Sequence, residues 1–401
     1  MNNAHFIIIT YYFGTAELTG SRRWREMAQL LRAHGRVSVI CADGAGEDCE
    51  GMEVLHLHDS NGPSQSGVFA GRPSSGGLIQ YLRRVASSLL FWPDRQQGWA
   101  RNAMQKLPSF ILAEEKTFII TSGPIFSVHS EMARWVRKNS GKVRWVMDFR
   151  DLWTNEIAPG LQRRTPLFLT AFERSIEQNC HATADLVTTI GEGLARLLQN
   201  SFGSCPIVLY NGYLKKSSPV SLPSNGPVSI RYLGTIIPEL RSPELLFKAA
   251  SNLGLSPKQV CFEFWCNDTA RIHYEASRVG VENLLKCHKA VTQKEAQKLS
   301  EEAGANIILN AIVSEADQVV TGKVFELIAA GRPIIAITGE NSELRKILES
   351  CSVQSSVWSL KSACSALEAV VNKSLPSPTD RNHKYSRQRA VNILIEALAK
   401  L

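Results

Sequence analysis

Short apolar runs alternate with amphipathic segments along most of the chain. Residues 6–10 and 37–41 have the length and β-branched content of buried strands, whereas residues 21–34 repeat apolar side chains at helical spacing. The same reading predicts further strands at 52–57, 117–121, 145–148, 186–189 and 207–209, and further helices at 127–138, 167–181 and 192–201. Strands that alternate with helices form a parallel sheet covered on both faces, so the first half predicts a Rossmann-like domain.

The alternation stops at residues 215–227, which are rich in serine, proline and glycine, and then restarts. Strands are predicted at 229–233, 259–265, 284–288, 306–309 and 334–337, with helices at 243–253, 272–279, 294–304 and after Thr321. The predicted domains are therefore residues 1–213, which a C-terminal helix at 386–401 can complete, and residues 214–385. Two Rossmann-like domains facing across a cleft are the simplest architecture.

Composition supports two domains and narrows the partners. A chain of 401 residues is too long for one ordinary core. The net charge of +8 has no basic tail, which argues against nucleic acid and suits anionic substrates or an anionic membrane surface. The cysteine number, nine, is odd, and the chain has no C-x-x-C pair, which favours a reducing cytoplasm and argues against a disulfide framework or zinc. The first residues read as a strand and not as a signal peptide.

One stretch departs from the alternation. Residues 60–77 are rich in Gly, Ser and Pro and predict a loop, and residues 78–92 predict an amphipathic helix with Arg83 and Arg84 beside Leu, Phe and Trp. This helix either packs on the core or lies at a membrane surface against anionic lipid headgroups. The second alternative predicts a peripheral protein at the inner face of the cytoplasmic membrane.

The segment from Gly322 to Pro333 combines a helix start with two charges. Lys323 and Glu326 are three residues apart and share one helical face, and Gly331 can end the helix. Backbone N–H groups and a lysine at a helix start favour phosphate, and a carboxylate one turn later can accept two hydrogen bonds from a sugar diol. The pattern predicts a nucleotide-sugar diphosphate site; the alternative is an i,i+3 salt bridge on a surface helix.

Three groups of polar residues follow predicted strands in the first half. A loop with Gly14 and Gly20 leads into a helix, either as a phosphate contact or as an ordinary turn. His129 lies in the first turn of a helix, where it is mostly neutral and either structural or a hydrogen-bond partner for a ligand. A third group, Asp148, Arg150 and Asp151, either stiffens its loop or contacts substrate hydroxyls, because ligands bind at the carboxyl ends of parallel strands.

In the second half, Thr235 follows a strand and Arg241 opens the next helix, where an arginine can bind a diphosphate bidentately. The chain contains no D-x-D, no H-E-x-x-H and no cysteine cluster. Neither a metal nor a cofactor is therefore expected, because lysine and arginine can neutralise a leaving phosphate.

These motifs together resemble the GT-B glycosyltransferases, specifically the retaining family 4 and its branch that makes bacterial capsule, O-antigen and exopolysaccharide. The resemblance rests on six segments in order: residues 11–24, 122–129, 148–153, 211–212, 234–243 and 322–333. It implies a GT-B fold and transfer of a sugar, with retention, from a nucleotide-diphosphate donor to a hydroxyl of a glycan, expected to be lipid-linked.

The resemblance also implies residue roles. Glu326 would hold the donor ribose, Arg241 and Lys323 would neutralise the diphosphate, and the Gly20 loop would approach the donor phosphate. A catalytic set would face the transferred sugar or the acceptor and comprises Asp148, Arg150, Asp151 and His129. The remaining donor-side candidates are Gly322, Thr235 and Gln318.

Two positions depart from the family pattern. Gln318 stands where a second glutamate is common, eight residues before Glu326, and Thr235 stands where an arginine is usual. These departures keep a non-catalytic scaffold in a polysaccharide assembly complex as an alternative. A nucleotide-sugar 2-epimerase, which also uses two Rossmann-like halves but needs no acceptor, is the other.

Overall fold

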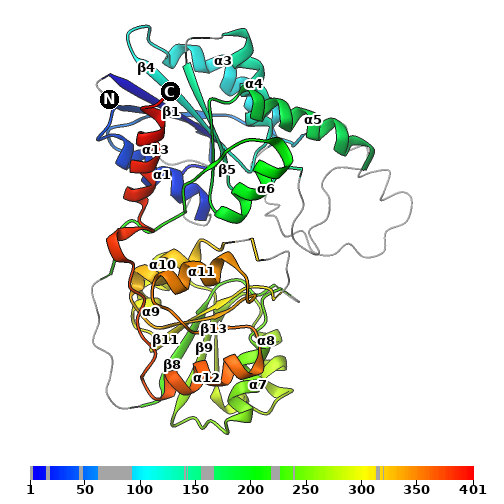
Figure 1. The fold of residues 1–401 in the computed structure, drawn as a ribbon, viewed down its shortest axis with the longest axis vertical. Coiled ribbons are helices and arrows are strands. Elements are labelled where there is room, and N and C mark those ends of the chain that lie inside the picture. The colour runs from blue at the N-terminus through cyan, green and yellow to red at the C-terminus, as the bar shows by residue number, and fades with distance from the viewer. Residues whose placement is uncertain are drawn as a thin grey trace. The chain divides into compact units, whose positions relative to one another are not determined.

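The structure is a computed structural model. It describes residues 3–14, 19–44, 48–61, 93–139, 141, 143–154, 167–217, 226–237, 240–312, 317–318 and 320–401. The chain forms two compact units: unit 1 comprises Met1–Tyr210 and Ala390–Leu401, and unit 2 comprises Asn211–Arg389. In each unit, helices pack on a parallel sheet (Figure 1).

Unit 1 is built on a parallel sheet with the strand order β3-β2-β1-β4-β5-β6-β7. The interior strand β1 pairs with both β2 and β4, and all seven of its residues are buried. The carboxyl ends of β4, β5 and β6 are in register, because Ser122 pairs with Asp148 and Asp148 with Thr188. The strands are β1 (Ala4–Thr10), β2 (Arg36–Ala42), β3 (Glu53–Leu57), β4 (Lys116–Ser122), β5 (Val143–Phe149), β6 (Leu186–Thr189) and β7 (Ile207–Val208).

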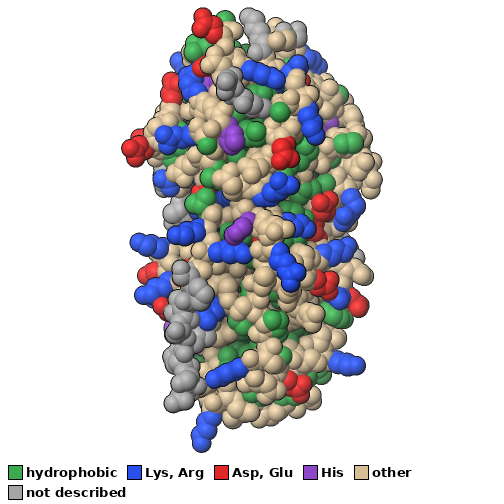
Figure 2. All heavy atoms as spheres, turned by 60° about the vertical axis from the view of Figure 1, so that its left-hand side comes forward, with side chains coloured by type: hydrophobic (Ala, Val, Ile, Leu, Met, Phe, Trp, Pro, Cys, Tyr) green, Lys and Arg blue, Asp and Glu red, His purple; other side chains and the backbone are tan. Residues whose placement is uncertain are grey.

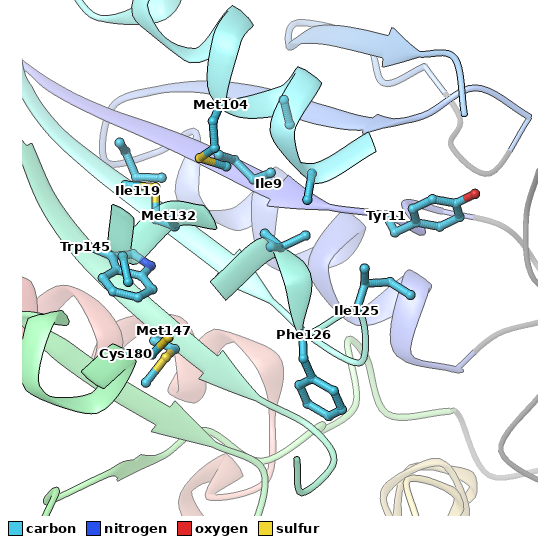
Figure 3. Packing of buried hydrophobic residues seen from close by; sticks show 14 of the residues in the cluster. Ile9, Tyr11, Met104, Ile119, Ile125, Phe126, Met132, Trp145, Met147 and Cys180 are labelled. Carbon is cyan, nitrogen blue, oxygen red and sulfur yellow. The ribbon is translucent and has the colours of Figure 1, made fainter. Parts of the chain in front are cut away.

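Helices cover both faces of this sheet. On one face, Met104, Met132 and Cys180 come from three different helices and meet Ile119 and Trp145 of the sheet (Figure 3). On the other face, α1 and the C-terminal helix share a second core with the sheet. The helices are α1 (Thr19–Leu31), α3 (Gln97–Lys106), α4 (Ser127–Lys138), α5 (Leu167–Thr183), α6 (Glu192–Phe202) and α13 (Arg387–Leu398).

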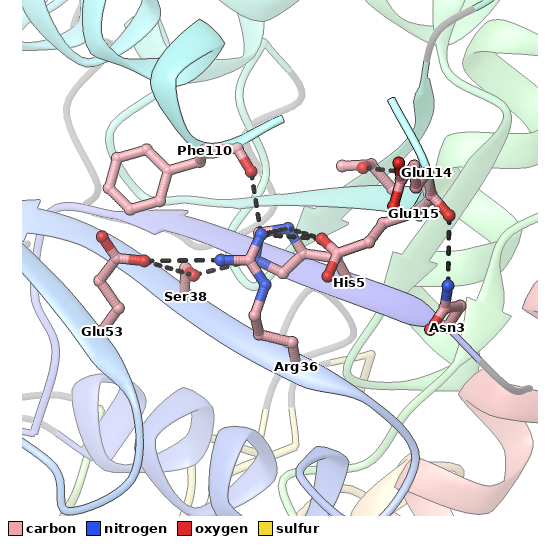
Figure 4. Close-up of polar contacts among 9 residues, drawn as sticks. Asn3, His5, Arg36, Ser38, Glu53, Phe110, Glu114 and Glu115 are labelled. Atoms are coloured by element: carbon pink, nitrogen blue, oxygen red, sulfur yellow. Dashed lines mark hydrogen bonds and ion pairs between the residues drawn. The ribbon is translucent and has the colours of Figure 1, made fainter. Parts of the chain in front are cut away.

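The amino-end edge of the sheet in unit 1 carries a polar network around a buried histidine (Figure 4). Arg36 donates to Nδ1 of His5 over 2.9 Å and to Glu115 over 2.8 Å. Since Nδ1 accepts, Nε2 carries the ring proton and donates to Ser38, which in turn donates to Glu53. Burial, reinforced by Arg36, lowers the pKa of His5 to about 4. This neutral histidine ties strands together at the edge opposite the candidate site.

Unit 2 repeats the plan with the strand order β10-β9-β8-β11-β12-β13. Its strands are β8 (Val228–Leu233), β9 (Val260–Cys266), β10 (Leu285–Lys289), β11 (Ala305–Leu309), β12 (Ile334–Ile337) and β13 (Ser356–Val357). Its helices are α7 (Glu244–Asn252), α8 (Thr269–Ser277), α9 (Gln293–Glu301), α10 (Lys323–Ala330), α11 (Glu343–Ser350) and α12 (Leu360–Val371). Local signals set the ends: Thr292 and Glu295 form a capping box on α9, and Gly331 ends α10 with a φ of 69°.

The observed elements match the predicted alternation with four additions: α3, α11, α12 and β13 are present but were not predicted. The expected helix at 78–92 lies outside the described residues, as do residues 62–77 and 218–225. Within the described part of the chain, no helix is long and apolar enough to cross a membrane. Basic and acidic side chains are interspersed on the face shown in Figure 2, in line with a spread charge excess.

Candidate functional site

Two cations of unit 2 lie at the carboxyl end of β8. Lys323 is the first residue of α10, and its Nζ lies 5.2 Å from the ring centroid of Tyr232. Gly234 follows β8 so closely that a Cβ there would come within 2.5 Å of that Nζ. Any larger residue at 234 would displace the lysine side chain, so Gly234 is part of this site. From the sequence alone, Gly234 was included only as one residue of a family segment.

Arg241 is the second cation. Its guanidinium donates to the carbonyl of Thr235 over 3.3 Å, and that carbonyl also accepts from the Tyr232 hydroxyl. Burial lowers the pKa of Lys323 to about 8, with Glu326 opposing and Arg241 adding to the shift. The ion pairs among the described residues include neither cation. Two neighbouring cations without a carboxylate partner there form a site suited to an anion.

Glu326 lies one turn further along α10 and is half-buried. Its Oε1 accepts a hydrogen bond of 3.2 Å from Gln293, the first residue of α9. The carboxylate affects Lys323 electrostatically, but the two do not form the ion pair that the sequence left as an alternative. Gly322 is the N-cap of α10 and supplies no side chain for capping. The N–H groups of Val324 and Phe325 donate to the carbonyls of Thr321 and Gly322 over 3.2 and 3.3 Å. The start of α10 therefore presents a lysine together with the positive end of the helix dipole.

The two positions that depart from the family pattern have different surroundings. The Thr235 side chain is exposed, and only its carbonyl takes part in the site. Gln318 has a buried Oε1, and neighbouring Asp317 a buried Oδ1, and neither atom has a hydrogen-bond partner within the described residues. No hydrogen bond joins Gln318 to Lys323 or Arg241 among the described residues.

In unit 1, Asp148 is surrounded by donors from the protein itself. It is fully buried and accepts from Arg23 at 2.7 Å, Trp24 at 2.9 Å, Ser122 at 2.8 Å and Thr188 at 2.8 Å. Burial alone would raise its pKa, but Arg23 and these hydrogen bonds hold the pKa below its usual range. The ion-pair partner of Asp148 is thus Arg23 of α1 and not Arg150.

Arg150 and Asp151 follow β5 directly. Both side chains are half-buried. Burial lowers the pKa of the Arg150 guanidinium, with Asp151 opposing the shift and Arg23 adding to it. Hydrogen bonds and ion pairs involving Arg150 are absent from the described residues. A partly desolvated guanidinium of this kind is available to a ligand.

His129 is fully buried in the first turn of α4. Trp145 donates to Oγ1 of Thr121 over 2.8 Å, and Oγ1 lies 2.9 Å from Nδ1 of His129. If the threonine hydroxyl donates to Nδ1, the indole N–H, the hydroxyl and Nδ1 all have partners, and the ring proton is on Nε2. Burial lowers the pKa of His129 to about 3, so the ring is neutral at physiological pH. Nε2 has no partner among the described residues and would lie 3.7 Å from a Cβ at Gly123.

The glycine loop is placed only in part. Gly20 is the second residue of α1, and residues 15–18 are not among those described. Gly14 has a φ of 83° and donates its N–H to the carbonyl of Ser21 over 3.3 Å. The left-handed conformation at 14 explains why glycine is needed where the chain leaves β1.

The candidate residues thus form two groups, one in each unit. The unit 1 group lies at or just beyond the carboxyl ends of strands and comprises Gly20, His129, Asp148, Arg150 and Asp151. The unit 2 group comprises Lys323, Arg241, Glu326, Gly322 and Thr235. Sequence reasoning missed several partners, namely Arg23, Ser122, Thr121, Thr188, Tyr232 and Gln293. Arg23 and Ser122 had a signal, because they lie in two of the segments that carry the resemblance, residues 11–24 and 122–129. Clusters of three or more His, Cys, Asp or Glu side chains fit to hold a metal are absent from the described residues.

Comparisons with solved structures place both units in a known architecture. The chain is similar to the lipopolysaccharide outer core galactosyltransferase WaaB in its apo form (TM-score 0.61, 12% identity, 99% of this chain and 100% of that one). It is also similar to the catalytic domain of starch synthase IV from Arabidopsis thaliana bound to ADP and acarbose (TM-score 0.60, 11% identity, 100% and 99%). A putative UDP-N-acetylglucosamine 2-epimerase from Listeria monocytogenes matches less closely (TM-score 0.53, 9% identity, 99% and 96%).

No family model and no curated protein matches this chain by sequence. At 9–12% identity, the structural likeness establishes the fold alone. The predicted fold class is confirmed: the chain has the GT-B fold, with two Rossmann-like parallel-sheet units.

Proposed function

We propose that this protein is a glycosyltransferase that takes a sugar from a nucleoside-diphosphate donor and passes it to a hydroxyl of a glycan. The single observation that carries the proposal is the cation pair in unit 2. Lys323 and Arg241 lie at one end of β8, half-buried and without a carboxylate partner among the described residues. Solved proteins of the same fold include a galactosyltransferase and a starch synthase bound to ADP.

The cation pair would act on the leaving group. As the bond between the anomeric carbon and the diphosphate oxygen breaks, negative charge grows on that oxygen, and two fixed cations stabilise it. Glu326 would accept hydrogen bonds from the ribose diol, and the positive end of the α10 dipole beside Lys323 would favour the phosphate. Lysine and arginine would supply the positive charge, so the proposal needs neither metal nor cofactor.

The unit 1 residues would meet the transferred sugar or the acceptor. His129 would donate from Nε2 to a sugar oxygen, as a neutral ring and not as an acid or base. Arg150 and Asp151 would contact hydroxyl or anionic groups of the substrates. Asp148, whose oxygens already have four protein donors, would position α1 and the Gly20 loop near the donor phosphate.

The family resemblance extends the proposal to stereochemistry and setting. The sugar would be transferred with retention, on one face of the ring, and the leaving phosphate would take the proton from the acceptor hydroxyl as the new glycosidic bond forms. The acceptor would be a lipid-linked glycan of a bacterial surface polysaccharide. The enzyme would act in the cytoplasm, at the inner face of the membrane.

The test is donor turnover by wild type, Lys323→Ala and Glu326→Ala. The substrates are nucleotide sugars with a lipid-linked glycan extract as the acceptor source. Loss of one charge contact on the leaving group is expected to lower kcat by about 100-fold or more. Near-normal turnover in both variants would show that the site is assigned wrongly.

A 2-epimerase is the second candidate, favoured by the likeness to the Listeria protein. Incubation with UDP-N-acetylglucosamine alone separates the two candidates. Formation of an epimer without any acceptor would establish the 2-epimerase activity. Nucleotide binding without turnover of any substrate would indicate the third alternative, a non-catalytic scaffold.

A further inference from the structure

Two buried glutamates of α5 hold the segment that follows β5. Glu173 and Glu177 are one helical turn apart, and only 5% and 1% of their surfaces are exposed. The indole N–H of Trp153 donates to Glu173 over 2.8 Å. Thr154 donates its backbone N–H over 3.1 Å, and also its hydroxyl, to one oxygen of Glu177. Two consecutive residues of the segment are therefore bound to carboxyl groups of one helix.

Trp153 is fixed from a second side as well. Its ring stacks on Phe126 with centroids 5.2 Å apart and planes 2° apart. Phe126 is the N-cap residue of α4, the helix whose first turn holds His129. The segment after β5 is thus fixed both to α5 and to the start of α4, and it begins with Arg150.

A contribution to stability does not explain why a glutamate stands at position 177. Among the described residues, no lysine or arginine forms an ion pair with Glu177, and the nearest ring nitrogen, in His181, is 4.0 Å away. Burial lowers the pKa of His181 to about 4, so that ring is neutral. Burial also raises the pKa of Glu177 to about 7, with Glu173 adding to the shift and Thr154 and Arg174 opposing it. A buried carboxylate without a cation costs stability that an amide at the same place would not.

We propose that Glu173 and Glu177 are positioning residues for Arg150. They fix the path of residues 150–154 and so the direction in which the Arg150 guanidinium meets its ligand. The inference rests on the proposed function, in which Arg150 contacts a substrate.

The test compares wild type with Glu177→Ala and Glu177→Gln. The alanine removes the acceptor for both Thr154 donors, so hydrogen exchange across residues 149–154 rises at least tenfold. Turnover falls by up to about 100-fold, the usual effect of misplacing a contact by about 1 Å.

In Glu177→Gln, the amide still offers an oxygen to Thr154, so protection from exchange and turnover are both restored. Because the amide does not titrate, the pH profile of kcat becomes flatter near neutrality. Glu131→Ala is the matched control, because Glu131 is also a buried glutamate but pairs with Arg101 and Arg134.

Nucleotide affinity measured in the same variants separates the positioning role of the glutamates from the proposed glycosyltransferase function. Unchanged affinity with slow turnover in Glu177→Ala supports the positioning role. Normal exchange and normal turnover in that variant would overturn it. If wild type has no turnover at all, the proposed function fails, while the exchange measurement still decides whether the glutamates hold the segment. Should Glu177→Ala not fold, Thr154→Val removes one of the two hydrogen bonds and is expected to raise exchange in the same segment.

Discussion

Asp148 of β5 and Arg23 of α1 form an ion pair of 2.7 Å with both side chains fully buried. Arg23 also donates to the carbonyl of Leu209, just beyond β7, over 3.0 Å. One guanidinium therefore joins α1 to two strand ends. This pairing fixes the start of α1, and with it Gly20, to the edge of the sheet where the candidate residues of unit 1 lie.

Removing this carboxylate is predicted to destabilise unit 1 strongly. Asp148→Asn leaves the Arg23 charge buried without a counter-ion, which costs about 3–5 kcal/mol in the free energy of unfolding. Urea unfolding measures the loss. The control is Glu349→Gln, which breaks the more exposed Arg345–Glu349 pair of α11 and should cost less than about 1 kcal/mol. Equal, small losses in both variants would contradict the structural role given to Asp148.

Acid is predicted to destabilise unit 1 through its buried histidines. Burial lowers the pKa values of His5 and His181 to about 4 and of His129 to about 3. The unfolded chain takes up these protons below pH 6.5 but the folded chain does not, so stability falls as the pH drops from 6.5 toward 4. Each histidine contributes about 1 kcal/mol per pH unit in that window.

The variant His181→Phe isolates the contribution of one histidine to the loss of stability in acid. The ring of His181 is stacked between Phe149 and Phe202, and neither of its nitrogens has a hydrogen-bond partner among the described residues. Phenylalanine keeps the stacking and is expected to remove about one third of the histidine-dependent acid loss, measured by urea unfolding at pH 7 and 5.5. Replacement of the exposed His273 by Gln should leave the slope unchanged. An unchanged slope in His181→Phe as well would show that this ring is protonated in the folded state.

Glu177 is predicted to act in the opposite direction. Its pKa is raised from 4.5 to about 7, so the folded protein binds a proton that the unfolded chain releases between these values. Stability from this group is present below pH 4.5 and is lost as the pH rises toward 7. Glu177→Gln should therefore stabilise the protein at pH 8, by up to about 3 kcal/mol, and by much less at pH 5. Thermal unfolding at both pH values decides this, and a variant less stable than wild type at pH 8 would contradict it.

Sequence patterns predicted the sheets well because apolar runs of four to seven residues, separated by helical periodicity, leave few alternatives. They missed α3, although Trp99, Ala100, Ala103 and Met104 share one buried face, because the helix follows a stretch with a different composition. The position of Lys323 and Glu326 at one helix start was predictable because both lie within four residues of the sequence. The pairing of Asp148 with Arg23 was not, because 125 residues separate them and Arg150 is the nearer arginine.

The ionisation of Lys323 predicts a pH dependence of nucleotide binding. Its pKa is lowered to about 8, so the free site loses a positive charge as the pH rises through that value. Nucleoside diphosphate affinity should be full at pH 7 and weaker by about tenfold at pH 9.5. Calorimetry at pH 8 should also detect proton uptake on binding, from the dependence of the heat on buffer ionisation enthalpy. Lys323→Arg remains charged and should lose this dependence; a wild-type affinity that is equal at pH 7 and 9.5 would contradict the assignment.

The central claim is that Lys323, Arg241 and Glu326 form a nucleoside-diphosphate site in unit 2. The most direct measurement is thermal unfolding of the full chain with UDP, ADP, GDP, CDP or dTDP, for wild type, Lys323→Ala, Glu326→Ala and the exposed control Lys298→Ala. A nucleotide at 100 times its Kd stabilises the folded state by about 2.7 kcal/mol. At least one nucleotide should raise the Tm of wild type and of Lys298→Ala, and the rise should be largely lost in the two site variants. No shift with any nucleotide, or the same shift in Lys323→Ala as in wild type, would contradict the claim.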